Sequence, residues 1–182
     1  MRRRIKAAKP NHASINPAAH VAHLLMNTMS TETKIKFERV DYRSLKGRQQ
    51  KNYNFQKVSG VLADFGYSTV RLTDDWDGAD FVAQHADGKT LLRVQLKPRL
   101  FFKKKYMGKG LWMCFRDGND IYLFPHDEVL QQVLDSGKVM KGSRSWEVEG
   151  GYSFPGLSKW LRPLLQQYKI SAITISSTTQ NV

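Results

Sequence analysis

Three polar side chains in the middle of the sequence have the types needed for phosphodiester chemistry: Asp80, Gln95 and Lys97. A carboxylate and an amide oxygen are hard donors of the kind that Mg²⁺ prefers, and Mg²⁺ keeps part of its water shell when it binds. A lysine beside such an ion could orient an attacking water or stabilise charge that develops on a phosphate. The three residue types therefore indicate metal-assisted hydrolysis, provided that the fold brings them together.

A predicted hairpin would bring them together. Two runs with strand character, Ala79 to Ala86 and Lys89 to Lys97, flank Asp87-Gly88, which is a strong hairpin signal. With these two residues as the loop, one face of the hairpin is wholly apolar and contains the pairs Ala79 with Leu96, Phe81 with Val94 and Ala83 with Leu92. A slip of one residue would mix apolar and polar positions, so the pattern supports this register.

The opposite face of the hairpin is polar at one end. It places Asp80 across from Gln95 and Lys97 diagonal to Asp80, within reach across neighbouring strands. The other two pairs on this face are Val82 with Arg93 and Gln84 with Leu91. The alternative interpretation is a half-buried hairpin whose polar face meets water. Asp80 and Lys97 would then form a surface ion pair worth under about 1 kcal/mol.

The flanking sequence predicts a sheet with helices around it. Phe55, Val58 and Leu62 recur at helical spacing within Leu45 to Phe65, and Gly66 supplies a stop signal. Further predicted strands are Tyr67 to Leu72, Leu111 to Arg116 and Ile121 to Phe124, and further predicted helices are His126 to Leu134 and Leu157 to Tyr168. This order of elements favours an α/β fold over a sandwich or a bundle.

Asp80, followed after fourteen residues by Gln95-Leu96-Lys97, resembles the active-site motif of the PD-(D/E)XK nuclease superfamily, which has the restriction-endonuclease-like fold. The resemblance implies a single domain with a mixed β-sheet flanked by α-helices. It also implies that Asp80 and Gln95 hold Mg²⁺ or Mn²⁺ while Lys97 assists the nucleophilic water.

The motif departs from the family pattern at two positions, because Ala79 replaces a proline and Gln95 replaces an acid. A glutamine at the second position occurs in some branches of the superfamily, including certain homing endonucleases. Many members also carry an acid on the first helix. The resemblance therefore implies a further catalytic contributor, for which Glu38 is the candidate in this sequence.

The charge of the chain favours a polyanionic partner. Lys and Arg number 29 against 16 Asp and Glu, which gives a formal net charge of +13. The segment from Gly88 to Arg116 contains basic and aromatic residues but no acid, and Gly108 and Gly110 permit a mobile loop around its lysines. We expect nucleic-acid contacts from Arg93, Arg99, Lys103, Lys104, Lys105, Tyr106 and Lys109. The alternative is a solvated loop that contacts nothing.

The acids just before the hairpin have several possible roles. We expect Asp74 and Asp75 to form a turn and Asp77 to be a candidate metal contact. The lone cysteine, Cys114, excludes an intrachain disulfide framework and a multi-cysteine zinc module, and we expect it in the core. No apolar run approaches the roughly 20 residues that span a bilayer, so we expect a cytoplasmic protein without a membrane partner.

The sequence divides into three predicted regions. Residues 1–31 form a basic, acid-free extension that we expect to be disordered, residues 32–170 the nuclease-like domain, and residues 171–182 a tail rich in Ser and Thr. The leading hypothesis is a metal-dependent DNA endonuclease. A homodimer or higher homo-oligomer would supply the two sites needed to cut both strands. The alternatives are a nuclease-fold protein that binds nucleic acid without catalysis, and a small structural or protein-binding α/β domain.

Overall fold

The computed structural model describes residues 35–138 and 140–171, and of Asp75 only the backbone. The chain divides into one unit that ends at Asp41 and a second that begins at Tyr42. In the first unit, the described residues 35–41 contain no helix or strand. The expected extension 1–31 and nearly all of the expected tail, residues 172–182, lie outside the described residues.

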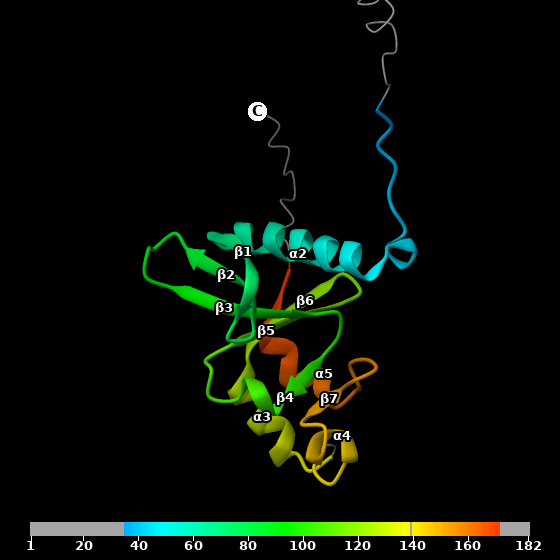
Figure 1. Ribbon diagram of the computed structural model, residues 1–182, viewed down its shortest axis with the longest axis vertical. Helices are drawn as coiled ribbons and strands as arrows, with labels where there is room; N and C mark the ends of the chain where they lie inside the picture. The colour runs from blue at the N-terminus through cyan, green and yellow to red at the C-terminus, as the bar shows by residue number, and fades with distance from the viewer. Residues whose placement is uncertain (1–34, 139, 172–182) are drawn as a thin grey trace, which may run out of the picture. The chain divides into compact units, whose positions relative to one another are not determined.

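A six-stranded mixed sheet organises the second unit (Figure 1). Its strands, in spatial order, are β1 (Tyr67–Trp76), β2 (Ala79–His85), β3 (Leu91–Lys97), β5 (Trp112–Asp117), β6 (Asp120–Pro125) and β8 (Lys169–Ile170). Neighbouring strands run antiparallel except β3 and β5, which are parallel. The expected α/β class, with a mixed sheet flanked by helices, is confirmed.

Helix α2 (Gly47–Asp64) covers one face of the sheet at the β2–β3 hairpin. Val58 and Leu62, which are one turn apart, are buried and pack in one apolar cluster with Phe81 and Val94 of the two strands. The helix ends at Asp64, and Gly66, whose φ of 78° suits glycine, turns the chain directly into β1. The predicted helix and its apolar stripe are therefore confirmed.

The predicted hairpin register is confirmed from Phe81 to Gln84, with Phe81 opposite Val94 and Ala83 opposite Leu92. The predicted pair of Ala79 with Leu96 lies beyond this ladder, and the two residues belong to different apolar clusters. The loop is longer than predicted, because the closing bond runs from the His85 N–H to the Thr90 carbonyl at 2.9 Å. Within the loop, the Asp87 carboxylate accepts 2.8 Å bonds from the N–H groups of Lys89 and Thr90. These bonds satisfy the donors of a four-residue loop, and β3 therefore starts at Leu91 instead of Lys89.

The turn before the hairpin lies later than predicted. Strand β1 continues through Asp74 and Asp75 because Trp76 pairs with Ala79, so the expectation that these two aspartates form a turn is wrong. The turn is Asp77-Gly78, with φ of 54° and 99°. A Cβ on Gly78 would lie 3.0 Å from the Tyr106 ring, so this position requires glycine.

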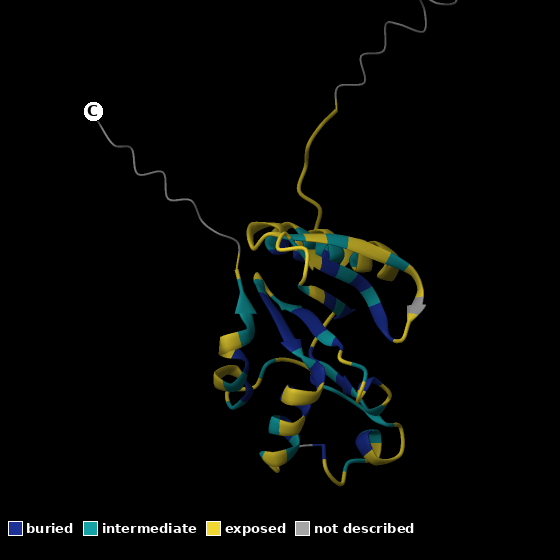
Figure 2. Cartoon of the chain, turned by 90° about the vertical axis from the view of Figure 1, so that its left-hand side faces the viewer, coloured by how far each residue is buried: buried dark blue, intermediate teal, exposed yellow. Residues whose placement is uncertain are grey.

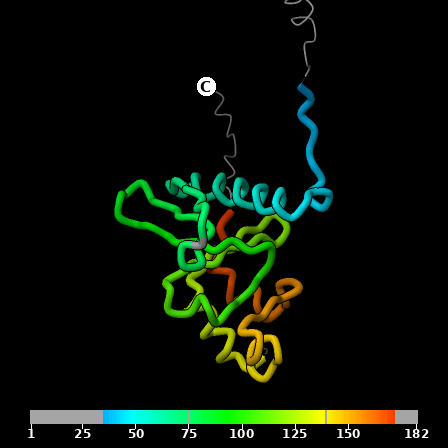
Figure 3. Tube along the Cα trace, in the orientation of Figure 1, coloured from blue at the N-terminus to red at the C-terminus, as the bar shows by residue number. Residues whose placement is uncertain are grey.

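The connection between the parallel strands β3 and β5 carries regular structure of its own. It contains β4 (Phe101–Lys103), which pairs with β7 (Gly151–Ser153), and the 3₁₀ helix η2 (Lys104–Tyr106). Figure 3 shows this segment leaving the end of β3 and returning to β5. The three lysines of the basic segment therefore lie in regular structure, whereas Gly108 and Gly110 lie in the loop that joins η2 to β5.

Shorter elements pack on the other face of the sheet, where a second buried cluster forms (Figure 2). They are α3 (His126–Asp135), α4 (Arg144–Glu147), α5 (Leu161–Leu165) and η3 (Gln166–Tyr168). The 3₁₀ helix η1 (Tyr42–Ser44) lies beside α2, where the Tyr42 hydroxyl accepts a 2.9 Å bond from the Asn54 amide. The predicted helix over 157–168 starts only at Leu161, which places Pro163 in a first turn where its missing N–H is tolerated. Within the described ranges, no helix is both long and apolar enough to cross a membrane.

His126, the first residue of α3, is fully buried between the crossover and the sheet. Its ring lies against Phe102 and Tyr106, and its Nδ1 lies 2.6 Å from an Asp127 carboxylate oxygen. Among the described residues its Nε2 has no hydrogen-bond partner. Burial lowers the pKa of His126 below its ordinary value of 6.5, although the bond to Asp127 opposes the shift. The ring is therefore held neutral at physiological pH.

We expect acid to destabilise the protein through His126. The unfolded chain takes up a proton first as the pH falls below about 6.5, so stability is lost there, with a slope of at most about 1.4 kcal/mol per pH unit. Replacing His126→Phe keeps an aromatic ring beside Phe102 and should flatten this slope. Urea unfolding at several pH values between 7.5 and 5 measures it. Equal slopes for variant and wild type would contradict the assignment.

Candidate active site

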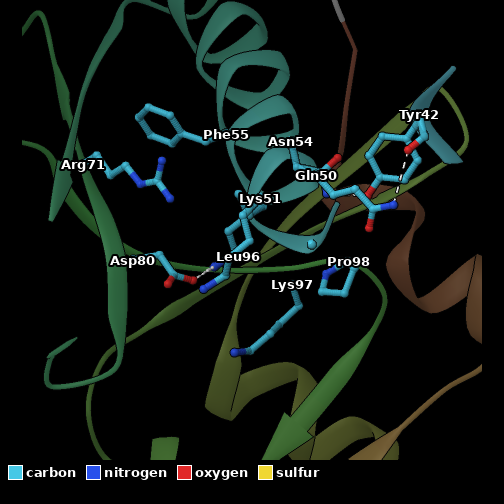
Figure 4. Close-up of a pocket in the computed structure, with 11 residues that line it drawn as sticks. Tyr42, Gln50, Lys51, Asn54, Phe55, Arg71, Asp80, Leu96, Lys97 and Pro98 are labelled. Atoms are coloured by element: carbon cyan, nitrogen blue, oxygen red, sulfur yellow. Dashed lines mark hydrogen bonds between the residues drawn. The ribbon is translucent and has the colours of Figure 1, made fainter. Parts of the chain in front are cut away.

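The Asp80 carboxylate joins the two strands of the hairpin at their polar end. Its Oδ2 accepts a 2.8 Å bond from the backbone N–H of Leu96 (Figure 4) and a second bond from the Gln95 side-chain amide. Both bonds fall on Oδ2, and Oδ1 accepts no hydrogen bond from another described residue. The sequence-predicted pairing of Asp80 with Gln95 is therefore present, and it fixes one carboxylate oxygen while leaving the other for a ligand.

Gln95 is buried, with 5% of its surface exposed. Its amide donates to Asp80, so the side chain orients the carboxylate. An acid at this position would repel the Asp80 carboxylate, whereas the neutral amide can bond to it. Compared with an acid, the Gln95 amide offers less negative charge to a cation. The amide oxygen is the atom of Gln95 that would bind the cation.

Lys97 is held at the end of β3 by two aromatic rings. Its Nζ lies 5.9 Å from the Phe101 ring centre and 5.7 Å from that of Tyr106. Burial lowers the pKa of the Lys97 ammonium below its ordinary value; Asp80 opposes this shift, and the positive charges of Lys51 and nearby lysines add to it. Lys97 is thus a restrained cation that gives up its proton more readily than an exposed lysine.

Other charged residues gather around the same point. A cavity of about 350 Å³ is lined by Asp80, Gln95 and Lys97 together with Lys51 of α2, Arg71 and Asp74 of β1, and Lys105 of η2. Cations therefore outnumber carboxylates in its wall, which suits an anionic ligand such as a phosphate. Sequence reasoning missed the following four members: Lys51, Arg71 and Asp74 entirely, and the placement of Lys105 at the site itself.

A signal for Lys51 was available in the sequence. Lys51 precedes Phe55 by four residues and Val58 by seven, so it lies on the face of the helix that packs on the sheet. Lys51 is exposed in the structure, but a lysine on that stripe near the helix start extends toward the sheet edge, which is where a site for an anion would lie. No comparable signal existed for Arg71 or Asp74, since their placement depends on how far β1 extends.

The oxygen donors at the cavity fit a weakly held divalent cation. Asp80, Asp74 and Gln95 line one space, and their side chains carry carboxylate and amide oxygens, which are hard ligands. The described residues contain no group of three or more His, Cys, Asp or Glu side chains that could hold a metal ion by themselves. A cation would therefore need water and phosphate oxygens to complete its coordination, as Mg²⁺ commonly does.

Two further residues predicted as contributors have other partners. Asp77 pairs with Lys109, and this hydrogen bond lowers the pKa of the Asp77 carboxyl. The expectation that Asp77 contacts a metal therefore has no support in its placement. Glu38 lies in the first unit, where its carboxylate pairs with Lys36. A catalytic role for Glu38 stays a prediction.

Three of the predicted nucleic-acid contacts are engaged within the fold. Lys104 lies 3.3 Å from a carboxylate oxygen of Glu147, and its Nζ also lies over the Trp146 ring. Lys109 pairs with Asp77 as described above, and the Arg93 guanidinium donates to the carbonyl of Lys109. These side chains brace the crossover segment.

The remaining predicted contacts face cavities. Arg99 and Lys103 line a space of about 310 Å³ that also borders Lys97. Lys105 is exposed, with its Nζ 5.1 Å from the Tyr106 ring centre. Tyr106 itself is only 3% exposed, so it supports the lysines and offers little ring surface to a base. Arg99, Lys103 and Lys105 are thus the members of the predicted set best placed to meet phosphates.

The sheet, the helices and this cavity define a mixed α/β protein with a cation-rich site at the end of a β-hairpin. No protein-family model matches the chain, and no curated protein matches it. Among solved structures the chain is similar to Hjc, a Holliday junction resolvase from the archaeal hyperthermophile Archaeoglobus fulgidus. The identity is 15% and the TM-score 0.27, over 43% of this chain and 74% of that one. A likeness of this extent assigns no activity.

The crowded charge at Lys97 should cost stability at neutral pH. Because its folded pKa lies below the ordinary 10.5, the charged form is penalised at neutral pH, and the penalty disappears as the pH rises toward 10.5. We expect Lys97→Met to raise stability by about 0.5–2 kcal/mol at pH 7.5, with a gain that shrinks by pH 10. Chemical denaturation at both pH values measures the gain.

The matched control is Lys89→Met, which changes an exposed lysine of the hairpin loop. Its effect should stay within about 0.5 kcal/mol at either pH. A loss of stability in Lys97→Met at pH 7.5 would show that the ammonium is stabilised where it lies, contrary to the direction of its pKa shift.

Proposed function

We propose that this protein is a metal-dependent endonuclease that hydrolyses phosphodiester bonds in DNA and belongs to the PD-(D/E)XK nuclease type. The observation that carries the proposal is the fixed Asp80 carboxylate, bonded to Gln95 and Leu96 beside the restrained Lys97, in a cavity with an excess of cations. The order of a helix, an antiparallel three-stranded meander and a parallel fourth strand supports it.

Each site residue has a role that follows from its placement. Asp80 Oδ1 and the Gln95 amide oxygen would hold Mg²⁺ or Mn²⁺, with Asp74 in reach of the same space. The bound ion would polarise the phosphate and lower the pKa of the attacking water. Lys97, restrained by Phe101 and Tyr106, orients that water or stabilises charge on the phosphate oxygens. Lys51, Arg71 and Lys105 attract the DNA backbone.

One such site cuts one strand. Cleavage of both strands of a duplex would need two sites, so a homodimer or higher homo-oligomer accompanies the proposal for duplex substrates.

A second candidate function is DNA binding without catalysis. Two observations favour it. The Gln95 amide donates a hydrogen bond to Asp80, and the described residues contain no cluster of three metal-ligating His, Cys, Asp or Glu side chains. The two candidates differ in whether a divalent cation produces any cleavage.

The first test is cleavage of supercoiled plasmid and branched DNA with Mg²⁺ or Mn²⁺. We expect cleavage that EDTA abolishes and that Asp80→Asn lowers by about 100-fold or more, because the variant removes a charged metal ligand. Asparagine keeps the volume and can still accept from the Leu96 N–H, so folding and DNA binding should persist.

The matched control is Asp135→Asn, at an exposed aspartate in the last turn of α3 that accepts from Gln131. It should cleave like wild type. Full cleavage by Asp80→Asn would remove Asp80 from the site. Binding without cleavage across all substrates and both metals would favour the non-catalytic candidate.

The second test is the salt dependence of DNA binding. Each phosphate contact contributes a slope of about 0.9 in log affinity against log salt. The double variant Lys103→Gln/Lys105→Gln should therefore bind more weakly and flatten the slope by about 2. Lys104→Gln is the control, since Lys104 already pairs with Glu147, and it should leave the slope unchanged. An unchanged slope in the double variant would exclude η2 and its flank from the interface.

A further inference from the structure

A second cavity adjoins the proposed cleavage site on its helix side. Its volume is about 220 Å³, and it lies between the first two turns of α2 and the end of β3 (Figure 4). It shares four residues with the cation-rich cavity: Lys51, Arg71, Asp80 and Lys97. A ligand that reaches the Asp80 carboxylate can therefore extend into this second space without leaving the protein.

The wall of this second cavity differs in character from that of its neighbour. Phe55, Leu96 and Pro98 present carbon surface to it, and the Arg71 guanidinium carbon lies 5.6 Å from the centre of the Phe55 ring. A ring and a guanidinium plane are the surfaces on which nucleobases stack. Gln50 lines the opposite side, where its amide nitrogen donates to the Tyr42 carbonyl at 3.3 Å.

The two cavities together therefore suit a ligand that has a flat apolar part and an anionic part. A nucleotide within a DNA strand has both, and the phosphate belongs in the cation-rich cavity where charge complementarity places it. A paired base cannot enter, because it is held in the duplex stack. An unpaired or displaced base has no such cost.

We propose that this helix-side cavity binds an unpaired base next to the phosphate at the Asp80 site, and that the protein therefore prefers DNA with unpaired nucleotides. The inference rests on the proposed function for the identity of the polyanion, and extends it to the class of substrate. The preference arises from stacking and not from base-edge readout, so it should tolerate any of the four bases.

The inference is tested by a substitution that adds a side chain at the edge of this cavity. Gly47, the first residue of α2, lines the cavity, and a Cβ built there meets no atom within 4 Å. Gly47→Leu should therefore fold, and we expect a leucine side chain at this edge of the cavity to narrow the space. Gly60→Leu is the matched control, because Gly60 lies on the same helix, is equally exposed and equally open to a Cβ, and lines none of the cavities described above. Both changes replace a helical glycine with a better helix former.

Binding is measured in EDTA, so that cleavage plays no part. The probes are two duplexes that carry fluorescent 2-aminopurine, one in a single-nucleotide bulge and one fully paired. We expect wild type and Gly60→Leu to bind the bulged duplex about tenfold more tightly and to change its fluorescence. Gly47→Leu should lose this preference while it keeps its affinity for the paired duplex.

Equal affinity of wild type for the two duplexes would overturn the inference, and so would a preference that Gly47→Leu retains. A cleavage assay with Mg²⁺ on the same duplexes separates this result from the proposed function. A preference for the bulged duplex without cleavage would support the base cavity and contradict the proposed nuclease activity. Cleavage without a preference for the bulged duplex would support the proposed nuclease activity and contradict base binding in the cavity.

Discussion

The hydrogen bonds that the Asp80 carboxylate accepts from β3 are the interaction on which the site depends. The backbone ladder between β2 and β3 ends at Phe81 and Val94, and beyond it the carboxylate takes the Leu96 N–H as its partner. A side-chain bond thus takes the place of a backbone bond. Beyond Phe81 and Val94, strands β2 and β3 are no longer paired through their backbones, but the Asp80 carboxylate still links them. The cavities open at the point of separation, and Gln95 and Lys97 flank it because they are neighbours of Leu96 on the same strand.

The site concentrates positive charge that the fold must hold in place. Lys97 lies between aromatic rings, and its lowered pKa reflects burial and the lysines around it. Such an arrangement is unfavourable in the protein alone and becomes favourable when an anion binds. The crossover between β3 and β5 supplies the support: Phe101 and Tyr106 come from it, and Tyr106 in turn packs against His126 and Gly78.

The crossover also decides which basic residues can meet a partner. Lys104 and Lys109 bind carboxylates of the protein, whereas Arg99, Lys103 and Lys105 line cavities or the surface around Lys97. Sequence alone treats the run as uniform, because a lysine that pairs with Glu147 and one that faces solvent have identical side chains. The difference comes from the pairing of β4 with β7, which brings together residues about fifty positions apart.

The sequence by itself determined α2, the hairpin register and hence the meeting of Asp80, Gln95 and Lys97, because these follow from local periods of 3.6 and 2 residues with turn signals between them. Only the tertiary structure decided the length of β1, the structured crossover and the placement of Lys51, Arg71 and Asp74 around the carboxylate. Those features depend on packing between segments distant in the chain, and the free energy of such packing is not encoded in any local pattern.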